Sequence, residues 1–394
     1  MLLGQGHGSA RDGAGRGARP TPAARPGVGH DPAHDVRDLL ALQLVPGVGP
    51  RLTQALLERF GSAAAIRRAS ARQLEEVPHI GPKLSRAIVD ALARVDVDAE
   101  LDKIARHGIR LLVRDQPGYP QVLSTIHDPP WLLYLRGSYE PDDARAIGMV
   151  GSRHGTAYGR RMAERLAGEL SRAGFTIVSG LARGIDAAAH RGALHAGGRT
   201  LAVLAGGLSR IYPPEHAELA QAIADSGGLL SEASMDQEPM AQMFPARNRL
   251  ISGLCRAVVI VEAAERSGAL ITAAHAAEQG REVFAVPGPI DSPLSAGTNE
   301  LIRQGAKLVR RVEDILDEVG GVTPPSVPRT VVEPAPALDD QEQQIWEFLN
   351  DGPRHIDDIV QGLGIGAGEA SRTLLMLEMK RRVRRLPGNL YERW

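Results

Sequence analysis

The sequence predicts an α/β fold built around a mainly parallel sheet, and three observations indicate it. Short apolar runs recur between residues 146 and 309, and most are separated by segments with helical periodicity. These runs are too apolar for strands with one solvent-exposed face. Such runs are typical of parallel strands that helices cover on both sides. The turns that follow them are rich in Gly, Ser and Arg. The predicted strands are 146–150, 176–179, 200–204, 229–232, 257–262, 282–286 and 307–309.

Composition limits the class of protein. The chain has 394 residues, 43% of them hydrophobic and 24% charged, so it can bury at least one core and divide into several domains. Lys plus Arg (46) nearly balances Asp plus Glu (47), so any basic surface must come from local clustering. The single cysteine, Cys255, excludes an internal disulfide framework and Cys-rich zinc sites. No apolar run approaches the roughly 20 residues of a membrane span, and the N-terminus lacks a signal-peptide core, so we expect a cytoplasmic protein without membrane contact.

Two related segments near the N-terminus, 44–61 and 76–92, each predict a helix, a tight turn and a second helix. In the first, Gly47 and Gly49 allow a sharp turn before the second helix, which is the helix-hairpin-helix pattern. Such hairpins bind DNA phosphate through backbone N–H groups at a helix start. His79 replaces the first glycine in the second copy, so we expect that hairpin to be degraded. A small helical packing domain without DNA contact remains an equal alternative.

The C-terminal part predicts three helices, 341–349, 355–362 and 367–380, followed by a ribbon that turns at Pro387 and Gly388. Three short helices and a ribbon are typical of a winged helix. Residues 107–137, dense in Pro and aromatics, are interpreted as a connecting segment packed on the next domain. In chain order, the predicted parts are a disordered tail (1–34), a helix-hairpin-helix or SAM-like helical domain (35–100), a Rossmann-like domain (101–320), a Pro-rich linker (321–338) and a winged-helix-like domain (339–394).

Ligands of open α/β sheets bind where strands end and helices begin, so the turns after the strands carry the candidate site. The glycines at 148, 151 and 155 lack the G-x-G-x-x-G spacing, and no acidic residue about 20 positions later ends a second strand, which disfavours a dinucleotide cofactor. Guanidinium and hydroxyl groups match phosphate oxygens, and several along one sheet edge suit a polymer. Each arginine alone is more often a solvated charge. The strand-end residues are Arg153, Arg183, Arg210, Arg247, Arg249 and Arg266, beside Ser152, Ser179, Asn248, Ser267 and Thr272.

Several motifs resemble those of one family. "GMVGSRHGTAYG", "IVSGLARGIDAAAHRGAL", "LAVLAGGLSRIYPPEH", "FPARNRLISGL" and "VVIVEAAERSGALITAAHAAEQGREVFAVPGPI" occur in the same order as in the DNA-processing protein A (DprA/Smf) family, over roughly residues 100–310. The resemblance implies a cytoplasmic bacterial protein without cofactor or metal. Such a protein binds single-stranded DNA on its Rossmann-like domain, forms a homodimer and loads RecA recombinase onto incoming strands during natural transformation. It leaves open whether the terminal domains bind double-stranded DNA. Its implied DNA contacts are Gly151, Ser152, Arg153, Ser179, Gly180, Arg183, Phe244, Arg247, Asn248 and Arg249.

Catalysis is disfavoured on the residues. Asp186 and His190 are four apart on a predicted helix, but without a nucleophile or metal partner the pair is expected to cap and pack that helix. Cys255 precedes a buried strand and is expected to be a packed thiol. The alternative is a nucleoside monophosphate hydrolase, because such enzymes share this sheet order and carry a P-G-G-x-G-T-x-x-E loop. Here the corresponding "RSGALITAAHAAEQG" lacks the paired glycines and Glu278 is offset, so a binding module is favoured.

Three further hypotheses concern contacts. The apolar segment 283–302 suggests self-association, and the basic run 380–385 suggests that the C-terminal module adds duplex affinity or a partner contact, with a solvated charge run as the alternative. Arg153 and free N–H groups of the helix that starts near Thr156 are expected to converge on one phosphate. Phe244 is interpreted either as a stacking surface for a base or as a core aromatic.

Overall fold

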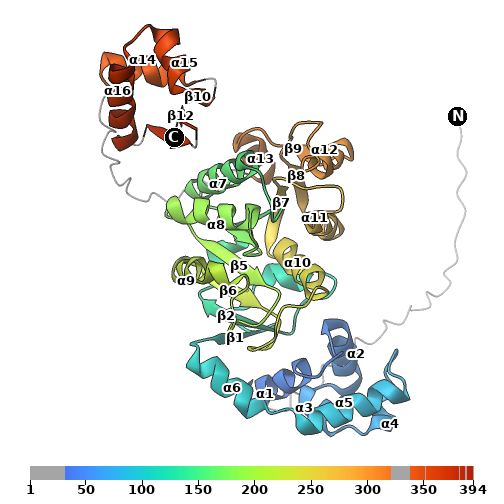
Figure 1. Ribbon diagram of the computed structural model, residues 1–394. Helices are drawn as coiled ribbons and strands as arrows, with labels where there is room; N and C mark the ends of the chain where they lie inside the picture. The colour runs from blue at the N-terminus through green and yellow to red at the C-terminus, as the bar shows by residue number, and fades with distance from the viewer. Residues whose placement is uncertain (1–31, 321–337, 351, 381, 387, 394) are drawn as a thin grey trace, which may run out of the picture. The chain divides into compact units, whose positions relative to one another are not determined.

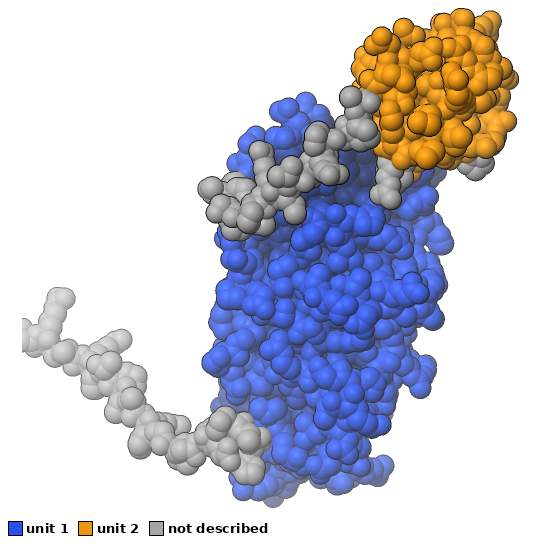
Figure 2. Space-filling model, turned by 90° about the vertical axis from the view of Figure 1, so that its left-hand side faces the viewer, with its two compact units in different colours: residues 1–323 blue, residues 324–394 orange. Residues whose placement is uncertain are grey.

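The chain divides into two compact units, residues 1–323 and 324–394, which Figure 2 shows in different colours. The structure, a computed structural model, describes residues 32–320 and 338–393, apart from positions 351, 381 and 387. Most of the expected N-terminal tail and of the expected Pro-rich linker lies outside these described residues. Within them, no helix is long and apolar enough to cross a membrane. The same described ranges contain no group of three His, Cys, Asp or Glu side chains that could hold a metal ion.

A nine-stranded sheet forms the centre of the first unit, and the strands from β6 to β9 in its spatial order are parallel (Figure 1). The sheet order is β1-β2-β6-β5-β4-β3-β7-β8-β9, so the chain builds one half outward from β3 and then returns to the other side of β3. The predicted mainly parallel sheet is therefore confirmed, with strand ends within two residues of the expected ones. The parallel strands are β3 (Ala146–Val150), β4 (Thr176–Ser179), β5 (Thr200–Leu204), β6 (Gly228–Ser231), β7 (Cys255–Ile260), β8 (Glu282–Ala285) and β9 (Lys307–Leu308).

Helices cover both faces of this sheet because successive strand side chains point to opposite sides. Ala146 and Val150 of β3 belong to one apolar cluster, with residues of α10 and α11, whereas Ile147 and Met149 belong to another, with residues of α7 and α8. The helices of this part are α7 (Ala157–Arg172), α8 (Ile185–His195), α9 (Ala217–Ser226), α10 (Met243–Gly253), α11 (Gly268–Glu278), α12 (Ala296–Arg303) and α13 (Glu313–Val319), with short 3-10 helices at Gln121–Thr125, Pro141–Arg145 and Pro214–His216.

The segment expected to be a connector contributes two strands instead. β1 (Arg110–Val113) and β2 (Leu132–Gly137) pair antiparallel with each other, and β2 pairs antiparallel with β6, so they extend the sheet at one edge. The Pro-rich stretch between them forms the loop of this hairpin. Leu132 to Leu135 are all buried, so β2 shows no alternation of apolar and polar residues. The run "WLLYLRG" was nevertheless a strand signal, since branched and aromatic residues favour strands.

Both predicted hairpins form, including the one expected to be degraded. His79 has φ +70°, close to the φ +84° of Gly47 at the equivalent turn position. Gly81 then precedes α5 as Gly49 precedes α2, each with Pro at the helix start. A non-glycine residue can adopt this left-handed conformation at a modest cost, so the substitution leaves the turn intact. The helices are α1 (Pro32–Gln43), α2 (Pro50–Phe60), α3 (Ala63–Arg68), α4 (Ala71–Leu74), α5 (Pro82–Arg94) and α6 (Val97–Arg106).

The N-terminal helices share a core with one end of the sheet (Figure 1). Gln43 Nε2 donates to Glu232 O at 2.7 Å, and Trp131 Nε1 donates to Pro50 O at 3.3 Å. The first hairpin therefore packs against the sheet domain, although its Gly47, Gly49 and Arg51 are exposed. His79, Gly81 and Lys83, at the same positions of the second hairpin, are also exposed. The two hairpins therefore have similar backbones and similarly exposed turns.

The second unit has the expected winged-helix arrangement. α14 (Asp340–Phe348), α15 (Ile356–Leu363) and α16 (Ala367–Met379) pack around their own apolar cluster. A three-stranded sheet of β10 (Arg354–His355), β11 (Val383–Leu386) and β12 (Leu390–Arg393) completes the unit in the order β10-β12-β11. All three predicted helices and the predicted ribbon are confirmed.

Candidate nucleic-acid interface

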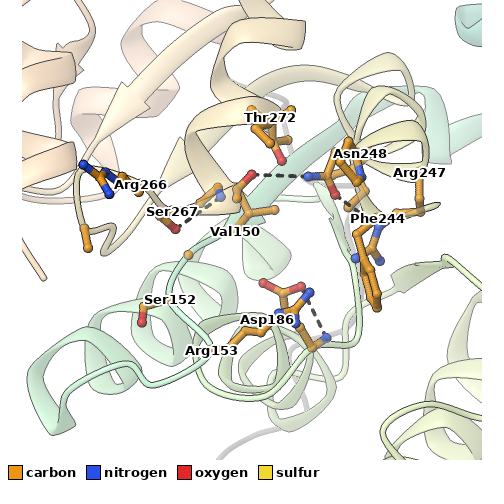
Figure 3. A pocket seen from close by; sticks show the side chains of 18 of the residues that line it. Val150, Ser152, Arg153, Asp186, Phe244, Arg247, Asn248, Arg266, Ser267 and Thr272 are labelled. Carbon is orange, nitrogen blue, oxygen red and sulfur yellow. Dashed lines mark hydrogen bonds between the residues drawn. The ribbon is translucent and has the colours of Figure 1, made fainter. Parts of the chain in front are cut away.

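A pocket of about 620 Å³ opens at the carboxyl ends of β3 and β7. The sheet order reverses beside β3, and such switch points are where open α/β sheets bind ligands. Figure 3 shows α10 contributing Phe244, Arg247 and Asn248, and the loop before α11 contributing Arg266 and Ser267. The pocket therefore lies at the strand ends, where the sequence placed the candidate site.

Arg153 is the exposed cation of the turn after β3. Its guanidinium lies 4.6 Å from the ring centroid of Phe244, a cation–π contact. The ring of Phe244 also packs edge-on against Tyr212, with centroids 6.3 Å apart. Among the described residues, Arg153 makes no hydrogen bond or ion pair, so its donors are available to a ligand while the ring orients the group.

Arg266 supplies a second exposed cation on the opposite side of the pocket. It precedes Ser267, whose side chain accepts from Ala269 N at 3.2 Å and so caps α11. The first turn of α11 has no acidic residue, so the positive end of this helix is uncompensated there. Arg266 has no hydrogen-bond or ion-pair partner within the part of the chain that the structure describes. The sequence placed Arg266 and Ser267 at a strand end but did not include them among the implied DNA contacts.

A buried carboxylate lies at the start of α7. The Glu262 carboxylate, at the end of β7 and only 4% exposed as a residue, accepts from Thr156 N and from Thr156 Oγ1, each at 2.7 Å. Thr156 Oγ1 in turn accepts from Gly159 N at 3.0 Å. A buried glutamate therefore lies at the N-cap residue of α7, beside the turn that carries Arg153. The expected convergence of Arg153 and free N–H groups of α7 on one phosphate stays a prediction.

Gly151 and Ser152 shape the turn that presents Arg153. A Cβ atom on Gly151 would lie 2.7 Å from Ile185 Cγ1 and 2.9 Å from Glu262 O, so only glycine fits. Ser152 N donates to Glu262 O at 2.7 Å, and its hydroxyl accepts from His154 N at 3.1 Å. Both residues line the pocket, but the hydrogen bonds of Ser152 stabilise the turn itself.

Ser179 and Gly180 lie in the interior behind the pocket. Ser179 Oγ donates to Met149 O at 2.6 Å and is fully buried. Gly180 has no room for a side chain, because Arg247 Nη1 lies 2.3 Å from where its Cβ would be. These two residues, implied as DNA contacts by the resemblance, are in positions where they hold the turn after β4 rather than face solvent.

Arg183 is exposed at the end of the same turn, but it is paired. Its Nε donates to Glu215 at 2.5 Å, and this contact raises the pKa of Arg183 and lowers the pKa of Glu215. Arg210, another strand-end arginine, pairs in the same way with Glu238 at 2.7 Å. Exposed pairs of this kind contribute little free energy to stability, but each one occupies its guanidinium group with a carboxylate of the same chain.

Arg247, Asn248 and Arg249 of α10 are buried and bonded inside the protein. Arg247 Nη1 donates to Gly180 O at 2.7 Å and to Val203 O, while Arg247 Nε donates to Asn248 Oδ1 at 3.2 Å. Asn248 Nδ2 donates to Gly268 O at 3.3 Å. Arg249 turns toward the N-terminal helices, where it pairs with Glu232 at 2.5 Å. Asn248 and Arg247 line the pocket, but their polar groups are largely committed to the fold.

Burial shifts the titration of the charged groups around Arg247. It lowers the pKa of Arg247 to about 10, although the nearby Asp186 charge opposes this shift. Burial also raises the pKa of Asp186, whose carboxylate accepts from Gly180 N and Ala182 N at 3.1 and 3.3 Å. His190, on the same helix, has its pKa lowered to about 3 by burial, and its Nδ1 lies 2.7 Å from Thr200 Oγ1. His190 of α8 thus packs in the interior, as the sequence predicted, whereas Asp186 holds the turn before α8, which has no side-chain cap.

The other candidate catalytic groups lie away from the pocket. Cys255 is buried, and burial raises the pKa of its thiol, which agrees with a packed side chain. Glu278 is at the C-terminal end of α11, the end opposite the pocket, where it lies 3.5 Å from His275 Nδ1. Neither Cys255 nor Glu278 therefore supplies a catalytic residue at the pocket for the hydrolase alternative.

Three families match consecutive parts of the chain. Residues 110–320 match DNA recombination-mediator protein A, residues 329–389 match the DprA winged helix domain, and residues 37–94 match the SAM-like helix-hairpin-helix tandem.

Named relatives are similar over long stretches. The chain is 46% identical over 213 residues to the DNA processing protein DprA of Bacillus subtilis, which covers 54% of this chain and 72% of the relative. It is 34% identical over 388 residues to Protein Smf of Synechocystis, which covers 90% and 98% of the two chains. The X-ray structure of DNA processing protein A from Streptococcus pneumoniae matches with a TM-score of 0.62 at 36% identity, covering 71% of this chain and 95% of that chain. The chain therefore belongs to the DNA recombination-mediator protein A (DprA/Smf) family, as its motifs predicted.

Proposed function

We propose that the protein binds single-stranded DNA in the pocket at the ends of β3 and β7. The observation that carries this proposal is the pair Arg153 and Arg266, two exposed guanidinium groups at the pocket that have no hydrogen-bond or ion-pair partner among the described residues. Guanidinium groups bind phosphate through forked hydrogen bonds, and the start of α11 adds backbone N–H groups beside Arg266. Cations on both sides of one hollow suit a polyanion that passes across it.

The apolar part of the pocket favours single strands over duplex. Phe244, Ile271 and Leu294 line it, so the pocket offers apolar surface as well as positive charge. The faces of bases are free to enter such a hollow only when they are unpaired. Contacts of this kind tolerate any sequence, because every base has an apolar face.

The test compares the full chain with Arg153→Ala/Arg266→Ala in gel shifts on matched single- and double-stranded oligonucleotides. We expect preference for the single strand and its loss in the double variant. Arg183→Ala/Arg210→Ala is the matched control, since it also removes two exposed arginines, and it should lose much less. Equal binding by wild type and Arg153→Ala/Arg266→Ala would contradict the proposal.

We further propose that the bound strand is protected and passed to RecA recombinase during natural transformation, in the cytoplasm. The family's description as a recombination mediator supports this role. RecA filament formation on a strand already covered by single-strand-binding protein should increase with the wild type and not with Arg153→Ala/Arg266→Ala. Equal stimulation by both proteins would contradict a role for the pocket in loading. Acting as a mediator requires no catalysis, and incubation with nucleoside monophosphates should release no free base.

We propose that the protein self-associates through the segment 283–302. Fewer of its apolar residues are exposed than the sequence suggested. Phe284, Ala285 and Val286 belong to the core, so much of its apolar content is internal. Ile290, 98% exposed, remains available. Light scattering should report a dimer at micromolar concentration, and Ile290→Asp should weaken it. A strict monomer would contradict this proposal.

The terminal parts are the candidates for duplex binding. In the C-terminal run, Lys380 pairs with Glu342 at 2.5 Å and Arg384 pairs with Glu392, so part of its charge is neutralised internally. The second hairpin carries an exposed lysine, Lys83, beside its turn. Removing residues 330–394 should leave single-strand binding unchanged, and Lys83→Ala should lower duplex affinity only.

A further inference from the structure

The outer face of α16, in the second unit, is apolar. Leu375, Met376 and Met379 are 57%, 43% and 73% exposed. The opposite face of the same helix already supplies the core of the unit through Ala370, Thr373, Leu374 and Leu377. A helix on a protein surface normally presents polar residues outward, and grouped exposed apolar residues mark an interaction surface.

This face is poorly suited to DNA, although α16 holds the place of the DNA-reading helix. In helix-turn-helix proteins the second helix of the motif enters the major groove, and α15 and α16 form that motif here. Leucine and methionine side chains donate no hydrogen bonds to phosphates or base edges. Arg372 is the one basic residue among the described positions of α16, and Glu369 and Glu378 oppose it. The chemistry of α16 therefore fits a protein partner.

The charged residues beside the apolar face make this surface self-complementary. Arg372 is three residues before Leu375 and Glu378 is three residues after it, and both are exposed. Neither has a hydrogen-bond or ion-pair partner among the described residues. Two antiparallel copies of α16 that cross at Leu375 would place Arg372 of each copy level with Glu378 of the other. Parallel copies would instead place like charges level with each other.

We propose that α16 pairs antiparallel with α16 of a second copy of this chain, about a two-fold axis at Leu375. A two-fold contact requires a self-complementary surface, and the order of Arg372, Leu375 and Glu378 provides one. Met376 and Met379 of each copy pack beside the axis, where flexible thioether side chains fill irregular gaps. This surface belongs to the second unit, whereas the pocket and the segment 283–302 belong to the first.

The contact is weak on its own and concentration-dependent. A helix of 13 residues is about 20 Å long, so one helix against another buries an area at the low end of specific interfaces. It strengthens when two chains are already held near each other, because tethering raises the effective concentration of the second contact. Neighbouring chains on one DNA strand would provide such tethering.

Cysteine cross-linking of the full chain tests this arrangement. The one native cysteine, Cys255, is buried and has a raised thiol pKa, so it contributes little background. Leu375→Cys places a thiol on the proposed axis, and a short bis-maleimide should link two copies there. Gln361→Cys, on the exposed side of α15 in the same unit, is the matched control. Equal cross-linking of the two variants would overturn the proposal.

Charge reversal in the Leu375→Cys background tests the antiparallel direction. Arg372→Glu and Glu378→Arg should each reduce the yield of covalent dimer several-fold, because each places like charges level across the axis. The two changes together should restore it. Failure of the double variant to recover, while the protein stays folded by circular dichroism, would overturn the pairing. If neither reversal alters cross-linking but Leu375→Asp abolishes duplex binding, α16 faces DNA and the proposal is wrong.

Discussion

Two pairs of arginines near the carboxyl ends of the strands differ in solvent exposure and in bonding. Arg153 and Arg266 are exposed at the pocket and have no hydrogen-bond or ion-pair partner among the described residues. Arg247 and Arg249 are buried on α10 and bonded to backbone carbonyls and carboxylates. The sequence context of all four is similar, with Gly, Ser or Asn close by. The difference teaches that an arginine at a strand end is available to a ligand only where the fold provides no internal acceptor.

The largest expected effect tests the buried pair. Arg247→Met removes the bonds to Gly180 O and Val203 O and leaves Asp186 buried without its nearby opposite charge. Breaking one side of a buried charge pair costs about 3–5 kcal/mol, so urea denaturation should show a fall of this size in the free energy of unfolding. Arg153→Met, the same change at an exposed position, should stay within about 0.5 kcal/mol of wild type. An Arg247→Met protein with full stability and no DNA binding would show that Arg247 is a DNA contact.

The second effect concerns the exposed pair. Arg153→Ala and Arg266→Ala should each lower single-strand affinity about 10- to 150-fold, since a hydrogen bond to a charged group contributes about 1.5–3 kcal/mol. Each should also reduce the slope of log affinity against log salt by about 0.7, and the double variant by about 1.4. Fluorescence anisotropy on one oligonucleotide over a salt series measures both quantities. If Arg210→Ala changes the slope as much, Arg153 and Arg266 contribute no more to binding than another exposed arginine.

A third, smaller effect comes from the charge environment behind the pocket. Because the pKa of His190 is held near 3 in the folded protein, the unfolded chain binds a proton below about pH 6.5 that the folded chain does not. The contribution of His190 to stability is therefore complete above pH 6.5 and is lost as the pH falls, at up to about 1.4 kcal/mol per pH unit. Asp186 acts in the opposite direction, because burial raises its pKa. His190→Asn should flatten the acid limb of stability against pH, and an unchanged limb would mean that His190 is protonated in the folded state.

The smallest effect decides what Phe244 does. Arg153 already lies over its ring, so we expect the ring mainly to orient Arg153. Phe244→Leu should then cost about 0.5–1 kcal/mol of binding, as for an exposed cation–π contact, and nothing more in an Arg153→Ala background. A stacked base would instead cost about 1–3 kcal/mol in both backgrounds. A double-mutant cycle on single-strand affinity separates the two.

Much of the fold was predictable from local pattern. Strands such as 146–150 and 200–204 are continuous apolar runs between turn residues, so the sequence predicted them residue for residue. β1 and β2 were missed because the Pro-rich stretch between them hid a hairpin with a long loop. The second hairpin was misjudged because the rule for glycine was applied strictly, whereas His79 adopts the same left-handed conformation as Gly47.

The sequence by itself determined the α/β class, the family and the strand end where the pocket lies, because periodicity and turn composition act over a few residues. The tertiary structure decided which polar groups face that pocket. It brought Glu262, which follows β7, to the start of α7, where its carboxylate accepts from the backbone and side chain of Thr156. It also directed Arg247 onto carbonyls of β5 and of the turn after β4. The physical reason is that a charged group leaves water only for partners that satisfy its hydrogen bonds, and these partners come from segments far apart in the chain.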